Sequence, residues 1–212
     1  MDIWHFFNQA LFWFALWLLA INLWILFFNG CVPNIRTAPA IRKNIIGLIR
    51  EDMQRNTERP YTIVDIGAGY GQFTREMARA FPDAKVVGLE ISKPTYWWCM
   101  LMKKTFRLDN LDYRHIDFFK YDMSGVSAVT LFFYRLDPVA KKLRRELKPG
   151  TFVASNKFHL LDNWVPKEVR DVKTRYPWQK RIFIYASPGM DDAGRDTPIP
   201  PAALLPHGAG GR

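Results

Sequence analysis

Cysteine and histidine are scarce in this chain, and neither is arranged as a metal site requires. Only Cys31 and Cys99 are present, which excludes a disulfide framework and a cysteine-based metal cluster. The histidines are scattered, without His-x-x-x-His or a similar spacing, and stand at His5, His115, His159 and His207. We therefore expect no metal site.

Positive charge is missing from the amino-terminal segment. The residues before position 10 include Asp2 but no lysine or arginine, whereas a secretory signal peptide begins with basic residues. Residues 10–28 are apolar apart from Asn22. At about 1.5 Å per residue, this length comes close to the roughly 30 Å of a bilayer core. The sequence predicts an uncleaved transmembrane helix over residues 10–28, after a short extracytoplasmic end at residues 1–9.

Other interpretations of this apolar segment are weaker. Cys31 follows Gly30, as in a lipoprotein signal, but Phe28 and Asn29 do not match the aliphatic and small residues expected before a lipidated cysteine. A buried core helix of a soluble protein is disfavoured by the length and the aromatic content. The three tryptophans on one arc of the helix face either lipid or a partner helix, and they are Trp13, Trp17 and Trp24.

Acidic residues are outnumbered, so the chain carries a formal net charge of +10. Arg36 and Arg42 are among the basic residues that follow the apolar segment, and the positive-inside rule then places the rest of the chain in the cytoplasm. A tethered basic domain is attracted to anionic lipid, which makes the bilayer an expected partner. No specific nucleic acid is expected, because no recognition motif is present. A solvated basic face is the remaining alternative.

Residues 63–71 are the most informative segment, because a predicted buried strand that carries Asp65 near its end leads directly into a glycine-rich turn. Glycines at alternate positions let the backbone approach a ligand and adopt torsions that a Cβ forbids. Gln72 stands where the dinucleotide fingerprint requires glycine, and no Gly-Lys-Ser/Thr follows. NAD and a phosphate-binding P-loop are therefore disfavoured. The glycines are Gly67, Gly69 and Gly71.

Further elements alternate along the chain. A second strand ends in Glu90, about 20 residues after the glycines, where a carboxylate accepts hydrogen bonds from ribose hydroxyls. This alternation predicts an α/β doubly wound sheet. An amphipathic helix that begins at residue 41 is expected beside the first strand. The predicted helices are 73–81 and 138–147, and the predicted strands after the first are 85–90, 111–115, 127–133, 151–156 and 181–186.

The pattern hydrophobic-Asp-hydrophobic-Gly-x-Gly-x-Gly resembles motif I of the class I, seven-β-strand methyltransferases that use S-adenosylmethionine. The resemblance implies a Rossmann-like sheet and S-adenosyl-L-methionine as cofactor. In that family an acidic residue after the third strand bonds the adenine amino group, and its neighbour packs on the ring. The alternative is that this acidic residue caps a turn and the neighbour belongs to the core. The implied cofactor-binding residues are Asp65, Gly67, Ala68, Gly69, Gly71, Glu90, Asp117 and Phe118.

Residues 33–186 resemble a narrower group, the membrane-anchored protein-lysine methyltransferases of mitochondria and their small prokaryotic relatives. The resemblance rests on motif I, on Glu-Leu-Lys-Pro-Gly-Thr within 141–153, on Ser-Asn-Lys-Phe at 155–158 and on Trp-Val-Pro at 164–166. The chain departs from these relatives at residues 35–38, where Ile-Arg-Thr-Ala stands in place of their Val-Pro-Thr-Pro. It implies N-methylation of lysine on a membrane-associated protein. No catalytic residue is assigned. Core residues or walls of an acceptor channel are the two interpretations of Phe133, Tyr134 and Trp164.

Two other functions stay open. One is a small-molecule or lipid methyltransferase that acts on a quinone or an amino headgroup, and the other is a non-catalytic membrane adaptor that binds S-adenosylmethionine. Exocyclic base amines are disfavoured as acceptors, because the fourth strand is not followed by Asn/Asp-Pro-Pro-aromatic. The expected organisation has a linker at 29–40, the methyltransferase domain at 41–186 and a Pro/Gly/Ala-rich, disordered tail at 187–212.

Overall fold

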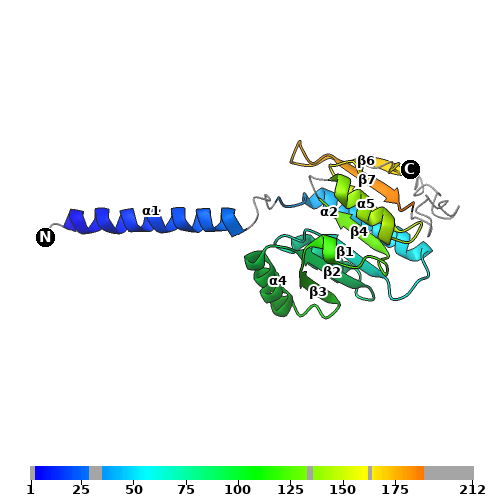
Figure 1. Ribbon diagram of the computed structural model, residues 1–212, viewed down its shortest axis with the longest axis horizontal. Coiled ribbons are helices and arrows are strands. Elements are labelled where there is room, and N and C mark those ends of the chain that lie inside the picture. The colour runs from blue at the N-terminus through cyan, green and yellow to red at the C-terminus, as the bar shows by residue number, and fades with distance from the viewer. Residues whose placement is uncertain (1–2, 29–34, 133–135, 162–163, 189–212) are drawn as a thin grey trace. The chain divides into compact units, whose positions relative to one another are not determined.

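A computed structural model of the chain describes residues 3–28, 35–132, 136–161 and 164–188 (Figure 1). The chain divides into two compact units, Met1–Asn34 and Ile35–Arg212. In its described part the first unit is a helix, and the second is an α/β domain.

The first unit contains the helix α1 (Ile3–Phe28), which begins well ahead of the predicted start at residue 10. Within it, Phe7–Trp24 is long and apolar enough to cross a bilayer, with a mean hydropathy of 1.3, and none of this window is buried. By length and composition it is a candidate membrane span, and a signal sequence passes the same criteria. The Asn22 amide donates a hydrogen bond of 2.7 Å to the Leu18 carbonyl one turn earlier, so the helix itself satisfies this polar group.

The second unit is built on a seven-stranded sheet with the strand order β3-β2-β1-β4-β5-β7-β6. The first five strands pair in parallel, whereas β7 is antiparallel to both β5 and β6. The order reverses between β1 and β4, and in open α/β sheets the ligand crevice lies at the carboxyl edge beside such a reversal. The strands are β1 (Thr62–Ile66), β2 (Lys85–Glu90), β3 (Leu111–His115), β4 (Ala128–Leu131), β5 (Phe152–Asn156), β6 (Glu168–Asp171) and β7 (Arg181–Ala186).

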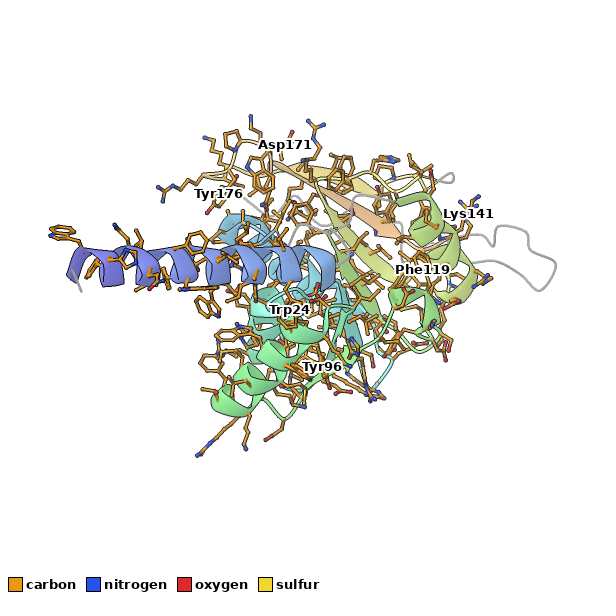
Figure 2. The ribbon with its side chains drawn as sticks, turned by 60° about the vertical axis from the view of Figure 1, so that its left-hand side comes forward. Trp24, Tyr96, Phe119, Lys141, Asp171 and Tyr176 are labelled. Carbon is orange, nitrogen blue, oxygen red and sulfur yellow. The ribbon has the colours of Figure 1, made fainter. Side chains whose placement is uncertain are left out.

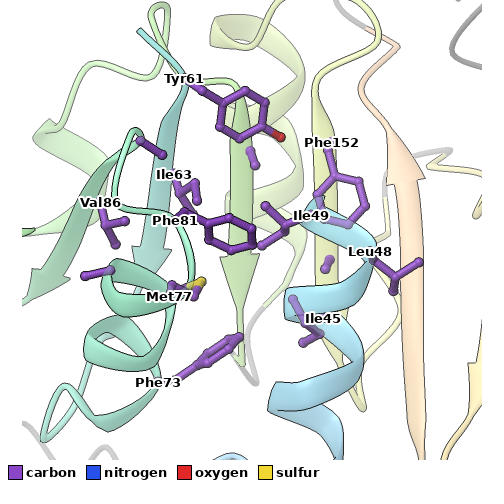
Figure 3. Close-up of a cluster of buried hydrophobic side chains, with 14 of the residues drawn as sticks. Ile45, Leu48, Ile49, Tyr61, Ile63, Phe73, Met77, Phe81, Val86 and Phe152 are labelled. Atoms are coloured by element: carbon purple, nitrogen blue, oxygen red, sulfur yellow. The ribbon is translucent and has the colours of Figure 1, made fainter. Parts of the chain in front are cut away.

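Helices cover both faces of this sheet, as its buried central strands require. One apolar cluster packs α2 (Pro39–Arg55), α3 (Gln72–Ala80) and Cys99 of α4 (Lys93–Phe106) against one face. Figure 3 shows Ile45, Leu48 and Ile49 of α2 in this cluster, with Phe152 of β5 among the labelled residues. The second cluster packs α5 (Leu136–Glu146) and the short 3₁₀ helix η1 (Phe118–Lys120) on the other face.

Most predicted elements are confirmed, and the doubly wound sheet among them. The strands at 85–90, 111–115 and 181–186 have the predicted bounds, while β4 ends earlier than predicted, at Leu131. The helix expected beside the first strand is α2, and its main strand contacts are instead with β5 and β7. The sequence patterns predict neither β6 nor α4. β6 is a short, polar edge strand, and α4 carries apolar residues on its outer face, so neither shows the usual periodicity.

Candidate functional site

The glycine-rich turn lies between β1 and α3, at the carboxyl edge of the sheet. All three of its glycines have left-handed backbone torsions, with φ of 72° at Gly67, 55° at Gly69 and 67° at Gly71. The amides of Gly67 and Ala68 both donate to the Leu89 carbonyl, at 3.0 and 2.9 Å, which ties the turn to β2. The prediction that alternate glycines are needed for their torsions is therefore confirmed.

Gly71 is needed for packing as well as for its torsion. A Cβ at this position would lie 2.2 Å from the hydroxyl of Tyr113 and 2.8 Å from Sγ of Cys99. The Tyr113 hydroxyl donates to the Gly71 carbonyl at 3.0 Å, and the Cys99 thiol donates to the Gly69 carbonyl at 3.0 Å. One side chain from β3 and one from α4 thus support the underside of the turn.

Asp65 lies beneath the turn, at the end of β1. Its carboxylate accepts hydrogen bonds from the hydroxyls of Thr74 on α3, at 2.6 Å, and Thr130 on β4, at 2.9 Å. Burial raises the pKa of Asp65 to about 6, and the neighbouring Glu90 charge also raises it, while the two hydroxyls lower it. Asp65 is therefore a group that holds β1, β4 and α3 together directly under the predicted cofactor position.

Glu90, at the end of β2, joins the turn to α4. One carboxylate oxygen accepts from the Gly69 amide at 2.8 Å, and the other accepts from the Ser92 amide at 2.8 Å. Each carboxylate oxygen has two lone pairs, so both retain acceptor capacity for ribose hydroxyls. This placement agrees with the position in which the glycine spacing predicts a ribose-binding acid.

Asp117 and Phe118 lie after β3, where the structure shows the capping arrangement. The Asp117 carboxylate accepts from the Phe119 amide at 3.0 Å and caps η1. The Phe118 side chain belongs to the core cluster that packs under α5, whereas Phe119 is exposed. One carboxylate oxygen of Asp117 has no role in the cap, so the geometry leaves it as an acceptor for an adenine amino group.

An aromatic cluster, Phe132, Phe158 and Trp178, lies at the edge of the sheet that carries the glycine turn. Leu131 of β4 pairs with Ile66 of β1, so Phe132 and the turn follow adjacent strand ends. The Phe132 ring centroid lies 6.0 Å from that of Phe158 and 6.4 Å from that of Trp178. The aromatic cluster therefore gathers residues from the ends of three segments at the sheet edge that carries the turn.

A cation of the chain itself occupies the aromatic cluster. The Lys157 ammonium lies 4.9 Å from the ring centroid of Phe158 and 5.5 Å from that of Trp178, within the range of a cation–π interaction. Lys157 has a φ of 72°, a left-handed torsion that is uncommon outside glycine and is enriched at functional sites. The cluster thus has the chemistry of a site for an alkylammonium group.

Of the three residues predicted either as walls of an acceptor channel or as core, the structure describes only Trp164. Trp164 is buried, donates from its indole nitrogen to the Ala140 carbonyl at 3.2 Å and packs on Tyr185 in the core. Phe133 and Tyr134 lie outside the described residues. The sequence signal that identifies the aromatic cluster is the location of Phe132 and Phe158 just after β4 and β5, whereas Trp178 lies in a loop that local patterns do not connect to the site.

The segment at residues 35–38 lies over the site. The Gln179 side chain accepts from the Ala38 amide at 2.7 Å and donates to the Arg36 carbonyl at 2.9 Å. The Arg36 guanidinium in turn lies 5.8 Å from the ring centroid of Tyr70, within the glycine turn. Asn156 donates to the same Gln179 at 3.2 Å, and its own Oδ1 is buried with no hydrogen-bond partner in the described part of the chain.

A cavity of about 250 Å³ lies at the opposite edge of the sheet, at the amino ends of β4 and β5. Its lining is mixed, with charged residues such as Asp52, Lys148 and Lys167 beside apolar ones such as Phe152. None of the predicted cofactor residues lines it. Among the described residues, no three His, Cys, Asp or Glu side chains gather as metal ligands.

Comparisons with known proteins agree with this geometry. The model of the family described as ANTKMT methyltransferase domain matches residues 65–168. A protein-lysine N-methyltransferase of Saccharolobus islandicus (strain REY15A) is 32% identical over 114 residues, which are 52% of this chain and 70% of that protein. A tRNA (guanine-N(7)-)-methyltransferase of Halorhodospira halophila (strain DSM 244 / SL1) is 30% identical over 115 residues, 48% of this chain and 50% of that protein.

A solved structure supports the same fold. The RNA methyltransferase from Salinibacter ruber, in complex with S-adenosyl-L-homocysteine, superposes with a TM-score of 0.58 at 24% identity, over 73% of this chain and 94% of that chain. The turn of three left-handed glycines with Glu90 at its rim fits the same cofactor class, because glycine adopts these torsions readily and the Glu90 carboxylate retains acceptor capacity for ribose hydroxyls. The chain therefore belongs to the class I S-adenosylmethionine-dependent methyltransferases, together with the protein-lysine methyltransferase that it resembles.

Proposed function

We propose that this enzyme is anchored in a membrane and N-methylates lysine on a membrane-associated protein. The aromatic cluster carries the proposal, because it holds the ammonium of Lys157 at the same edge of the sheet as the cofactor turn. The named activity of the Saccharolobus relative supports the same acceptor. In this proposal the acceptor lysine takes the place that Lys157 occupies.

The aromatic cluster suits the chemistry of a lysine acceptor. When bound, S-adenosylmethionine supplies a methyl group from its sulfonium, and the protein must hold the acceptor nitrogen about 3 to 3.5 Å from that carbon. A lysine amine must first lose a proton, which costs about 4 to 5 kcal/mol at pH 7 from an ordinary pKa near 10.4. Phe132, Phe158 and Trp178 position the acceptor ammonium by cation–π contact, and because Trp178 is exposed, the proton can leave to solvent before methyl transfer.

Anchoring is supported by α1 and by the charges that follow it. No residue of the candidate span Phe7–Trp24 is buried, as expected for a lipid-facing helix. Basic residues begin at Arg36, and the positive-inside rule assigns their side of the membrane to the cytoplasm. Extraction of membranes with alkaline carbonate tests this part. An anchored protein stays in the pellet at full length, and release or a shortened amino terminus would contradict the anchor.

The acceptor is tested by incubating membranes with the purified full chain and radioactive S-adenosylmethionine, and then separating protein, organic extract and RNA. We expect label in protein, recovered as methyl-lysine after acid hydrolysis. Phe132→Ala and Trp178→Ala should reduce this labelling at least tenfold and leave the calorimetric affinity for the cofactor unchanged. Val169→Ala is the matched control, because Val169 is an exposed apolar residue on the edge strand β6.

The other outcomes identify the competing functions. Label in the organic extract would assign the enzyme to a quinone or an amino headgroup, and label in RNA would match the acceptor class of the Halorhodospira relative. Cofactor binding without transfer to any fraction would indicate a non-catalytic adaptor. Each of these results would replace the lysine proposal.

A further inference from the structure

The outer face of α4 is apolar, which is unusual for a helix that covers a sheet. Thr95 and Cys99 form its buried face. On the opposite side Trp97 is 60% exposed and Leu101 is 55% exposed. The other large apolar side chains exposed on this helix are Trp98, Met100 and Phe106. Soluble helices normally place polar side chains on this side.

Basic residues accompany this apolar face. Lys93 and Lys104 are exposed on α4, and at about 100° per residue both lie on the same arc as Trp97 and Leu101. Lys103 and Arg107 follow at the carboxyl end, and residues 93–108 contain no acidic residue. Neighbouring arginines on α3 extend the positive surface, because Arg79 lies 4.5 Å and Arg75 lies 5.8 Å from the ring centroid of Phe106.

The inner face of the same helix contacts the cofactor site. Cys99 donates to the Gly69 carbonyl, and Ser92, which precedes α4, donates to Glu90. Because a helix with its side chains is about 10 to 12 Å across, whatever covers the outer face lies about one helix diameter from the glycine turn.

We propose that the outer face of α4, formed by Trp97, Trp98, Leu101 and Lys104, rests on the surface of an anionic lipid bilayer. Tryptophan and aliphatic side chains beside lysine, without acidic residues, are the composition of helices that lie in the membrane interface. The charge is complementary to anionic headgroups, and the same chain carries a candidate span in α1. The proposal holds whichever acceptor the enzyme methylates.

The seating of α4 is tested on the full chain reconstituted into vesicles of phosphatidylcholine, with and without phosphatidylglycerol. A nitroxide is attached at Leu101→Cys in a Cys31→Ser background. The buried Cys99 does not take up the label. The control is Lys141→Cys on α5, an exposed position on the other face of the sheet (Figure 2). Relaxation of each nitroxide by oxygen and by a water-soluble nickel chelate then reports whether it lies in lipid or in water.

In vesicles with phosphatidylglycerol we expect the label at 101 to be relaxed by oxygen and protected from nickel, while the label at 141 stays accessible to nickel. Lys93→Gln with Lys104→Gln should shift the seated fraction toward water by roughly fivefold for each lysine removed. Equal nickel accessibility at 101 and 141 in both vesicles would overturn the proposal. Immobilisation without oxygen access would show a protein partner instead, and dipolar broadening between labels would show a second copy of this chain.

Discussion

The hydroxyl of Tyr113 on β3 donates a hydrogen bond of 3.0 Å to the carbonyl of Gly71, at the start of α3. Tyr113 also excludes any side chain at position 71, because its ring and hydroxyl occupy the space that a Cβ there would take. The edge strand therefore sets the shape of the cofactor turn. This relationship leads directly to a first prediction about the turn.

Gly71→Ala should destabilise the protein and abolish cofactor binding. The added Cβ would meet the Tyr113 hydroxyl at 2.2 Å, and alanine would have to adopt a φ of 67°. Together these effects should lower the free energy of unfolding by about 2 to 4 kcal/mol. Urea unfolding and calorimetry with S-adenosylmethionine measure the two effects.

The control for this change is Gly47→Ala. Gly47 lies within α2, and a Cβ there has no atom within 4 Å. Alanine is the better helix former by up to about 1 kcal/mol, so this variant should be at least as stable as the parent. If both variants unfold alike, the steric account of Gly71 is wrong.

Glu90→Gln should weaken S-adenosylmethionine binding and leave the fold in place. The amide retains one acceptor for Gly69 or Ser92 but loses the charge that strengthens hydrogen bonds to ribose hydroxyls. A loss of about 1.5 to 3 kcal/mol corresponds to a rise in Kd of roughly 10- to 150-fold by calorimetry. Glu58→Gln is the control, because Glu58 pairs with Lys148 on the surface. An unchanged affinity in Glu90→Gln would remove Glu90 from the cofactor site.

Asp65 should make the protein less stable as the pH rises from about 4 to about 6. Its pKa is about 6 in the folded state and 3.8 ordinarily, so the folded state holds the proton more tightly. The free energy of unfolding attributable to this group is then highest below pH 4 and falls by on the order of 3 kcal/mol by pH 6 to 7.

Asp65→Asn isolates this effect. Asparagine has an acceptor and a donor for Thr74 and Thr130, since a hydroxyl can serve in either role. The difference in free energy of unfolding between the two proteins should change through pH 4 to 6, because their other carboxyl groups cancel. Parallel curves across this range would refute the raised pKa.

The thiol of Cys99 should be unreactive in the folded protein. Burial raises its pKa to about 12, and the nearby Glu90 charge acts in the same direction. Since the thiolate is the nucleophile, the ionised fraction at pH 8 falls by about a thousandfold relative to a thiol with its ordinary pKa of 9.0. In a Cys31→Ser variant, mass spectrometry should find no alkylation by iodoacetamide until urea unfolds the chain. Modification of the native protein at the rate of a free thiol would contradict this environment.

Local patterns were sufficient for six of the seven strands and for the glycine turn, because buried strands are apolar runs and left-handed torsions require glycine at fixed positions. They were insufficient for contacts between distant segments. Thr130, one of two partners of Asp65, is 65 residues away along the chain, and Gln179 reaches Ala38 across 141 residues. The sequence around Thr130 and around Gln179 contains no pattern that predicts these contacts.

Aromatic residues were the hardest to assign from sequence. Trp164 is an aromatic residue of the kind that lines a channel, but it fills the core between α5 and β7. Phe132, near the end of a predicted strand, instead lies in the aromatic cluster. Burial of a ring depends on which element covers it, and that follows from the sheet order. The exposed tryptophans of α4 are a second example. The sequence pattern does not show which side of this helix is buried, and that side is fixed by its packing on β2 and β3.

The apolar face of α2 rests on β5 and on β7, and β7 is the last strand in the part of the chain that the structure describes. Ile45 and Ile49 share one cluster with Ile182 and Ile184, and β7 also separates β5 from β6 in the sheet. During synthesis α2 is made long before β7, so its apolar face cannot be fully covered until most of the domain has been translated. A nascent chain arrested before β7 would expose that face to chaperones and to aggregation. Completion of this cluster therefore requires the chain through residue 186.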